Sequence, residues 1–283
     1  KEMEEYNCAY QHWLKSTEEV KQKDPQASWK EIHKICGECP WPQPVGWQSP
    51  FRPNGLHETM IRRIAPYSLR GFLYYQGEED VQRYADYSDM MQMLVKQWRM
   101  DWNDWNLPFL FVQLPMYLAD GEKDDSYWAL QREQQYIASM MIQNAGMISL
   151  ADCGEYDNIH PLDKKTPGER LFQLAKNLVY DKQGTITATA AQLFSDNGKL
   201  YVTFDHLHEK LVMQTANGCP FEISGEDNLF YPAKADVIHG NMLCISNPAV
   251  KFPSAVKYAW YNFGEAVLFT ESGNPVSPFF KCV

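Results

Sequence analysis

Three short apolar runs alternate with segments of helical periodicity in the middle of the chain. The run at 107–114 is continuous and bounded by prolines, as expected of a strand buried on both faces. The segments between the runs place their apolar residues on one side of a helix. This alternation predicts parallel pairing and an α/β layered domain. The predicted strands are 69–75, 107–114 and 147–152, and the predicted helices are 84–102, 128–146 and 166–181.

Beyond residue 182 the pattern changes to short β-like runs separated by turns such as Asn197-Gly198 and Asn217-Gly218. These runs predict an antiparallel β-sandwich or jelly-roll-like module. The first part of the chain is polar and helical, and a Pro- and Gly-rich connection follows it. The predicted organisation is a helical insertion or connection at 1–45, the C-terminal part of an α/β domain at 46–181, and the β-module at 182–283.

The predicted helix at 166–181 has a well-defined start. Thr166 is the expected N-cap, Pro167 occupies the first helical position, and Glu169 completes a capping box. A fixed helix start stiffens the loop before it, and that loop carries Asp157 and His160.

Composition narrows the class of protein. The chain has 283 residues, is 45% hydrophobic and 14% aromatic, and carries a formal net charge of -10. It can therefore bury a core. The acidic balance argues against nucleic acid as a partner, because phosphate binding needs clustered Lys and Arg. No apolar run is long enough to predict a membrane span.

The chain has an odd number of cysteines, which cannot all pair within one chain. Cys36 and Cys39 form a C-x-x-C, but zinc usually takes four ligands and a redox role needs a thioredoxin-like context. Structural or incidental cysteines are the simplest interpretation. With the absence of an N-x-S/T sequon, they favour a bacterial cytoplasmic location over a secreted or periplasmic one. The chain begins at Lys1 without an initiator Met, so we expect a fragment or a processed product.

Polar residues follow two of the predicted strands. Gln76, Gly77 and Glu78 follow the first strand, and Asp157 and His160 follow the third. Parallel strands bring such loops to one edge of the sheet, where ligands bind. A carboxylate three residues before an imidazole can orient it as a general base, and an amide can donate to an oxyanion. The alternatives are a solvent-exposed Asp–His loop and a polar turn.

Other residues allow competing hypotheses. His57 and Glu58 flank the expected cleft, and His57 is a candidate substrate contact. His206, His208 and Glu209 could ligate a metal, although surface exposure is the simpler interpretation. Four aromatic residues could stack on sugar rings, but their spacing is more typical of core positions. These are Trp102, Trp105, Tyr117 and Trp128.

Several segments together resemble the sialate O-acetylesterase family, which are carbohydrate esterases of the SGNH-hydrolase type. The resemblance covers about residues 46–280 and is carried by "FRPNGLHETMI", "GFLYYQGEED", "LPFLFVQLP", "DNIHP" and the C-terminal segment through "AVKYAWYNF". Tyr74, Glu58 and Lys257 depart from the family's usual Trp, Asn and Arg, and none of these changes removes a proton-transfer group. The resemblance implies an SGNH-like three-layer parallel sheet, incomplete in this chain, followed by the β-module.

The family's nucleophile is a serine in a G-Q-S-N-M block, and this chain contains no such block. Ser49 in "GWQSPF" lacks the following Asn-Met, so it is a poor candidate. The resemblance therefore implies that the nucleophile comes from an upstream segment or a companion chain, the N-terminal half of the same precursor. His160 would act as the base, Asp157 would orient it, and Gln76 would help to stabilise the oxyanion.

The implied function is hydrolysis of acetyl esters on sialic acid or related sugars, with an O-acetylated carbohydrate as the substrate. Neither a metal nor an organic cofactor is expected. One alternative is an acetyl xylan esterase of the same architecture. The other is a non-catalytic glycan-binding protein that uses the β-module and a vestigial cleft.

Overall fold

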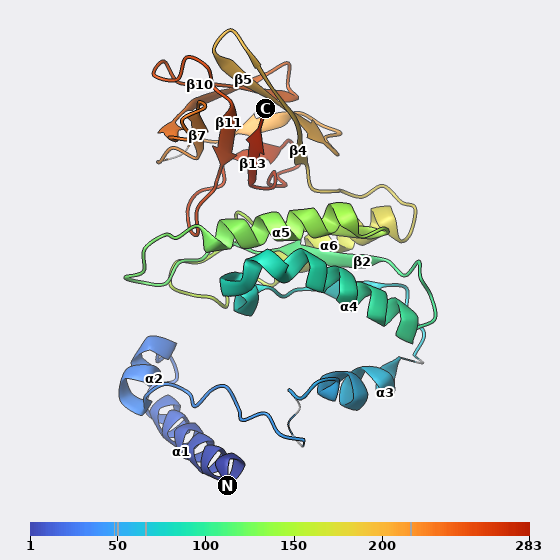
Figure 1. Cartoon of the computed structure of the whole chain (residues 1–283), viewed down its shortest axis with the longest axis vertical. Coiled ribbons are helices and arrows are strands. Elements are labelled where there is room, and N and C mark those ends of the chain that lie inside the picture. Colours follow the sequence, from blue (N-terminus) through green and yellow to red (C-terminus); the bar gives the residue numbers. More distant parts are fainter. Residues whose placement is uncertain (48, 50, 66, 216) are drawn as a thin grey trace. The chain divides into compact units, whose positions relative to one another are not determined.

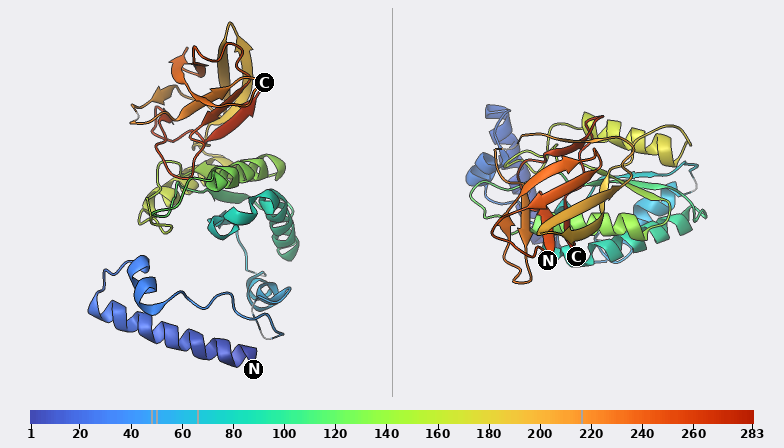
Figure 2. Two further views of the ribbon diagram at one scale, coloured as in Figure 1. Left: turned by 60° about the vertical axis from the view of Figure 1, so that its left-hand side comes forward. Right: turned by 90° about the horizontal axis from the view of Figure 1, so that it is seen from above.

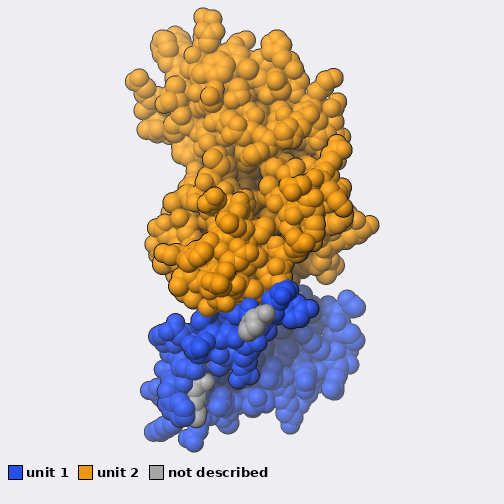
Figure 3. Space-filling model, turned by 90° about the vertical axis from the view of Figure 1, so that its right-hand side faces the viewer, with its two compact units in different colours: residues 1–68 blue, residues 69–283 orange. Residues whose placement is uncertain are grey.

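The computed structural model describes residues 1–47, 49, 51–65, 67–215 and 217–283. The chain forms two compact units, Lys1–Ser68 and Leu69–Val283 (Figure 3). The α/β part and the β-module both lie within the second unit. The predicted boundary at 181/182 therefore falls inside that unit, where the parallel sheet gives way to antiparallel strands.

Unit 1 is helical. Helix α1 (Glu2–Lys23) and helix α2 (Trp29–Cys36) lie next to each other (Figure 2). They pack together through Trp13 and Trp29, whose ring planes are nearly parallel with centroids 6.4 Å apart. Ser28 caps α2 in a reciprocal capping box with Glu31. A π-helical turn, η1 (His57–Ile61), then runs into the short helix α3 (Arg62–Ile64).

The core of unit 2 is a three-stranded parallel sheet in the order β1-β2-β3. Helices α4 and α5 pack on one face of strand β2 through Phe109 and Phe111, and α6 packs on the other face through Leu110 and Val112 (Figure 1). All residues of β2 are buried, which confirms the prediction from its continuous apolar run. The elements are β1 (Phe72–Tyr74), the 3₁₀ helix η2 (Glu78–Asp86), α4 (Tyr87–Asp101), β2 (Phe109–Gln113), α5 (Tyr127–Met141), β3 (Ala145–Ser149) and α6 (Lys165–Leu178).

The start of α6 differs from the prediction. The helix begins at Lys165, and its N-cap Lys164 makes no side-chain cap hydrogen bond, so Thr166 is not the N-cap. The Asp163 carboxylate instead accepts hydrogen bonds from the backbone N–H groups of Lys165 and Thr166, each at 3.0 Å. An ionised carboxylate is a stronger acceptor than a hydroxyl and is favoured at a helix N-terminus. Pro167 still lies in the first turn, where its missing N–H costs nothing.

The β-module contains two four-stranded antiparallel sheets and one two-stranded sheet. The two larger sheets share one hydrophobic core, to which Leu200 and Leu243 contribute from one sheet and Ile223 and Val256 from the other. The first sheet is β4 (Thr189–Asp196), β5 (Lys199–Asp205), β10 (Met242–Ser246) and β9 (Lys234–Ile238). The second is β13 (Phe279–Cys282), β11 (Ala255–Tyr258), β7 (Phe221–Ser224) and β8 (Tyr231–Pro232), and the third is β12 (Leu268–Thr270) with β6 (Leu211–Met213).

The two predicted turns have different outcomes. Asn197 and Gly198 have φ of 48° and 74° and connect β4 to β5, as expected of a hairpin turn. Asn217-Gly218 does not close a hairpin, because β6 and β7 belong to different sheets. Asn217 instead donates to the Glu265 carboxylate from its backbone and side-chain nitrogens, both at 2.8 Å.

The structure also bears on membrane association and cysteine chemistry. Within the described part of the chain, no helix has both the length and the apolar character that a membrane crossing requires. All seven cysteines, including Cys36 and Cys39, are free thiols. Burial raises the pKa of Cys153 to about 12, so this thiol stays protonated at neutral pH.

Candidate active site

The two candidate loops lie at the carboxyl edge of the parallel sheet. Gln76 follows β1, and the loop that carries His160 follows β3. Tyr75 and Ile159, which are the neighbours of Gln76 and His160, pack into one small hydrophobic cluster with Trp128. Both loops therefore border the same small hydrophobic cluster at the carboxyl edge of the sheet, where the parallel arrangement of the strands predicted a ligand site.

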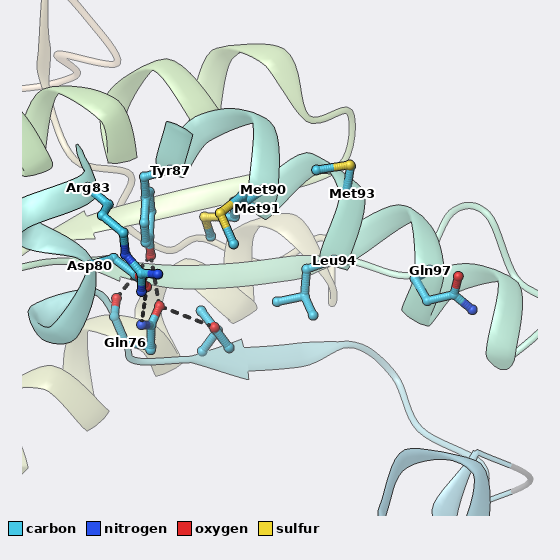
Figure 4. A pocket seen from close by; sticks show the side chains of 10 residues that line it. Gln76, Asp80, Arg83, Tyr87, Met90, Met91, Met93, Leu94 and Gln97 are labelled. Atoms are coloured by element: carbon cyan, nitrogen blue, oxygen red, sulfur yellow. Dashed lines mark hydrogen bonds and ion pairs between the residues drawn. The ribbon is translucent and has the colours of Figure 1, made fainter. Parts of the chain in front are cut away.

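Gln76 is held by side chains on three sides. Its Nε2 donates to Oδ2 of Asp80 at 2.7 Å, and its Oε1 lies 3.3 and 3.4 Å from the hydroxyls of Tyr74 and Tyr87 (Figure 4). Its backbone carbonyl accepts from Nε2 of Gln135 at 3.2 Å. A primary amide carries two N–H donors, so one of them remains for a ligand. Burial raises the pKa of Tyr74 to about 12, so this hydroxyl is a proton donor at neutral pH.

Gly77 adopts a backbone conformation that only glycine accepts readily. Its φ is +147°, and a Cβ at this position would lie 3.0 Å from Nε2 of Gln135 and 3.1 Å from Nε2 of Gln131. Glu78 then opens the first turn of η2. The Gln131 side chain is fully buried, and neither of its polar atoms has a hydrogen-bond partner among the described residues. The burial of the Gln131 amide beside Gly77 was not predicted. In the helical pattern of the sequence, Gln131 cannot be distinguished from a polar residue on the exposed side of the helix.

The loop between β3 and α6 is shaped by its own carboxylates. Glu155 accepts from the Leu162 N–H at 2.6 Å and from Nδ2 of Asn158 at 2.7 Å. The backbone hydrogen bond from Leu162, and then that from Asn158, hold the pKa of Glu155 below its usual value. Asn158 in turn accepts from the backbone N–H of His160 at 3.1 Å. These bonds fix the backbone on both sides of the imidazole.

Asp157 is anchored to the segment that follows β2. Its backbone has φ 57°, its N–H donates to the Leu118 carbonyl at 3.0 Å, and its Oδ1 accepts from the Asp120 N–H at 2.8 Å. The His160 side chain is exposed, and within the described residues no hydrogen bond joins it to Asp157. The carboxylate still has its second oxygen as an acceptor. Catalytic hydrogen bonds in ligand-free enzymes are often long and tighten when the substrate binds.

Asn262 links the β-module to the segment that anchors Asp157. Its backbone carbonyl accepts from the Tyr117 N–H at 2.8 Å, and its backbone N–H donates to Oδ2 of Asp124 at 2.7 Å. Its Oδ1 accepts from the Trp128 N–H at 3.0 Å and its Nδ2 donates to Oδ1 of Asp125 at 2.8 Å. Asn262 therefore caps α5 from a distant part of the chain, and no local sequence signal could have revealed this.

Arg132 forms a second link between the two parts of unit 2. This guanidinium is buried and donates to the backbone carbonyls of Pro115 and Tyr261. Burial lowers the pKa of Arg132 to about 10, which still leaves it charged at neutral pH. Gln113 at the end of β2 adds a hydrogen bond of 2.8 Å to the Ser277 hydroxyl. The β-module is thus joined to the sheet edge that carries the candidate site.

Two of the predicted residues belong to unit 1. His57 lies in η1 with its Nδ1 4.0 Å from Oε1 of Glu58, which also accepts from Arg62. Ser49 is fully buried, and its hydroxyl accepts from the Phe51 N–H at 3.1 Å. A buried hydroxyl in a tight turn is a structural group, which agrees with the expectation that Ser49 is a poor nucleophile.

The remaining candidates differ in their surroundings. The rings of Tyr117 and Trp128 pack together with centroids 5.0 Å apart, whereas Trp105 is exposed. Trp102 packs against Phe72 with centroids 5.1 Å apart. Over the described ranges, no group of three or more His, Cys, Asp or Glu side chains is placed to hold a metal ion. Next to His206 and His208, Glu209 accepts from the N–H and hydroxyl of Ser272 at 2.8 and 2.5 Å.

Known proteins match this chain over the same region. The sequence model of the family described as carbohydrate esterase, sialic acid-specific acetylesterase, matches residues 44–177. The sialate O-acetylesterase of Mus musculus is 27% identical over 260 residues, and that of Homo sapiens is 25% identical over 208 residues. The matches cover 81% and 66% of this chain but 47% and 39% of those proteins. The chain thus spans about half the length of the mouse protein and a smaller share of the human protein.

A solved structure agrees with these sequence matches. The carbohydrate acetylesterase of Xanthomonas citri superposes with a TM-score of 0.74 at 32% sequence identity, over 80% of this chain and 53% of that chain. The matched family region contains both candidate loops, and the matched structure has the same mixed α/β arrangement. Over residues 44–177, which carry both candidate loops, this chain is therefore similar to the sialic acid-specific acetylesterase family of carbohydrate esterases.

Proposed function

We propose that this chain is the part of a carbohydrate O-acetylesterase that supplies the general base, and that the complete enzyme hydrolyses acetyl esters on sialic acid or related sugars. The observation that carries the proposal is that Tyr75, next to Gln76, and Ile159, next to His160, pack against one hydrophobic cluster at the same sheet edge. Similarity to the acetylesterase family supports the reaction type.

His160 has the role of general base and then general acid. Its Nε2 accepts the proton of an attacking alcohol and later returns a proton to the leaving sugar oxygen. Asp157 stabilises the imidazolium and selects the tautomer by accepting from Nδ1. The Asp120 N–H holds Oδ1 of Asp157, which limits the rotation of this carboxylate and leaves its other oxygen for the imidazole.

The Gln76 loop has the role of stabilising the tetrahedral oxyanion. Gln76 is positioned by Asp80 and Tyr87, so its remaining N–H is oriented before the substrate arrives. Gly77 allows the backbone to approach the ligand without a side chain in the way. Glu78, at the start of η2, is a candidate acceptor for a sugar hydroxyl.

The nucleophilic serine comes from polypeptide outside residues 1–283. Ser49 is buried and engaged with Phe51, and the chain covers only 47% of its mouse relative. We therefore assign the nucleophile to an upstream segment or companion chain.

We further infer an SGNH-like layered sheet that this upstream segment or companion chain completes. We also infer a β-sandwich in residues 182–283, which is supported by the two four-stranded sheets around one core.

The test is acetate release from O-acetylated sialic acid by the complete gene product and its variants. His160→Ala should reduce the turnover number by on the order of 100- to 10,000-fold, because general acid–base catalysis is lost. His208→Ala is a matched control, since that exposed histidine lies in the β-module. Unchanged turnover in His160→Ala, with a folded protein, would falsify the assignment.

A further inference from the structure

A small pocket lies between helix α5 and the β-module. Its walls come from α5, β4, β13 and the segment after β11, all within unit 2. Its volume of about 220 Å³ is below the ~300–1,000 Å³ of ordinary ligand pockets, so it has room for a single ring. Ligands often bind where two packed parts of a protein meet.

Aromatic rings form part of the pocket wall. Tyr136 reaches the pocket from α5, Trp260 from the segment after β11, and Phe280 from β13. The rings of Trp260 and Phe280 have their centroids 5.7 Å apart. All three side chains are partly exposed, so each has surface left for a ligand. A ligand with C–H groups on its faces would pack against these rings.

Two groups of opposite charge line the same pocket. Lys281 holds its Nζ 5.2 Å from the centre of the Tyr136 ring. Glu133 is half-buried, and within the described residues its carboxylate has neither a hydrogen bond nor an ion pair. Burial raises the pKa of Glu133, and the charge of Lys281 opposes this shift. A carboxylate taken out of water without a partner costs free energy, and its presence in a pocket points to a ligand that supplies the partner.

The charges in the pocket favour a neutral ligand with many hydroxyls. The charges of Glu133 and Lys281 cancel, so neither an anion nor a cation gains from the pocket as a whole. Glu133 accepts hydrogen bonds, Lys281 donates them, and the hydroxyl of Thr189 does both. A pyranose carries hydroxyls around its edge, which suit these three side chains, and C–H groups on its faces, which suit the aromatic rings.

We propose that this pocket binds one neutral pyranose residue of a glycan, at a site separate from the candidate active site. Glu133 accepts from its hydroxyls, Lys281 donates to them, and Trp260 and Phe280 pack on a face of the ring. This inference goes beyond the proposed function, because binding here requires neither the serine nor an acetyl group.

The geometry of α5 separates the pocket from the Gln76 loop. Gln131 and Gln135 approach Gly77, and each is two positions from Glu133 along the helix. Residues two positions apart in an α-helix do not share a face. The pocket therefore lies on the opposite side of α5 from Gly77, and a sugar can occupy it without entering the candidate active site.

Sugar binding by the complete gene product tests the pocket without an activity assay. The probes are the methyl β-glycosides of glucose, galactose and xylose, and binding is measured by saturation-transfer NMR. We expect at least one to bind with a dissociation constant on the order of 1 mM, which is ordinary for so small a ligand. Glucuronic acid and glucosamine should bind more weakly. The proposal is overturned if no neutral probe binds, or if a charged sugar binds as tightly as the best neutral one.

Glu133→Leu distinguishes a ligand group from a structural one. The substitution removes an unpaired carboxylate and no hydrogen bond, so the urea midpoint should stay at or above that of the wild type. Sugar binding should weaken on the order of 10-fold, because a charged acceptor is lost. A lower midpoint would show a structural role for Glu133, and wild-type affinity would show that no sugar contacts it; either result contradicts the proposal.

Lys281→Met provides a second test on the other side of the pocket. It should also weaken sugar binding on the order of 10-fold. Lys199→Met is the matched control, because Lys199 is an exposed lysine at the start of β5 and does not line the pocket. Equal affinities in the two lysine variants would overturn the assignment. None of these measurements uses acetate release, so their failure leaves the proposed esterase function standing, and failure of that function leaves the pocket to be decided by binding.

Discussion

Substitution of Asn262 should show how strongly the β-module supports the candidate site. Asn262 is 3% exposed, and its side chain accepts from the Trp128 N–H and donates to Asp125. Asn262→Ala removes both bonds but keeps the backbone bonds to Tyr117 and Asp124. The perturbation is therefore confined to the cap of α5 and its carboxylate partner.

The expected loss of unfolding free energy is the sum of the costs of losing the two side-chain hydrogen bonds of Asn262. The Trp128 N–H would be left buried without an acceptor, which costs about 1–3 kcal/mol. The bond to the more exposed Asp125 contributes ~0.5–1 kcal/mol. The free energy of unfolding should thus fall by about 1.5–4 kcal/mol, which is a large part of the stability of an ordinary domain.

Urea unfolding followed by far-UV circular dichroism measures this change. The midpoint should fall in Asn262→Ala with an unchanged slope. Asn241→Ala is the control, because Asn241 is exposed and its side chain makes no hydrogen bond within the described structure. The Asp157 amide, which donates to Leu118, should also exchange faster in Asn262→Ala. A midpoint equal to that of Asn241→Ala would refute the claim that Asn262 holds this region.

Two further predictions concern the loops themselves. Gly77→Ala should lower the free energy of unfolding by about 1–3 kcal/mol and abolish acetate release. The reason is that a Cβ would meet Gln131 and Gln135, and that a φ of +147° is strained for alanine. Wild-type stability in a urea titration would contradict this prediction. Because the folded-state pKa of Glu155 is depressed, its bond to Leu162 stabilises the loop above the ordinary pKa of 4.5, and this contribution is lost as pH falls through the depressed value. Glu155→Gln should therefore flatten the fall in unfolding free energy below about pH 4.5, and parallel pH profiles for the two proteins would count against it.

Local sequence patterns were sufficient to predict the helices and strands. They were insufficient to predict which residues cap them and hold them in place. The continuous apolar run of β2 predicted a strand buried on both faces, and the structure buries all of it. The helix after the loop that carries His160 was also predicted, but Asp163 rather than Thr166 caps it. Both residues are good caps, and only the path of the backbone decides which of them reaches the free N–H groups.

At the candidate site, too, local sequence patterns predicted the positions of the loops but not the distant residues that hold them. Parallel strands predicted that the loops of Gln76 and His160 would lie at one sheet edge, and Tyr75 and Ile159 pack against the same hydrophobic cluster there. The role of Asn262 could not be predicted, since its partners lie more than one hundred positions away in the sequence. Long-range caps of this kind depend on the tertiary fold and leave no periodic or spaced signal.

The location of the reactive serine tests the proposed function more directly than any other measurement. The active protein isolated from its source should be labelled with a fluorophosphonate and digested, and the modified peptide should be identified by mass spectrometry. We predict one labelled serine, on a peptide absent from residues 1–283, and no labelling in the His160→Ala variant. A label on Ser49 or on any other serine of this chain would contradict it.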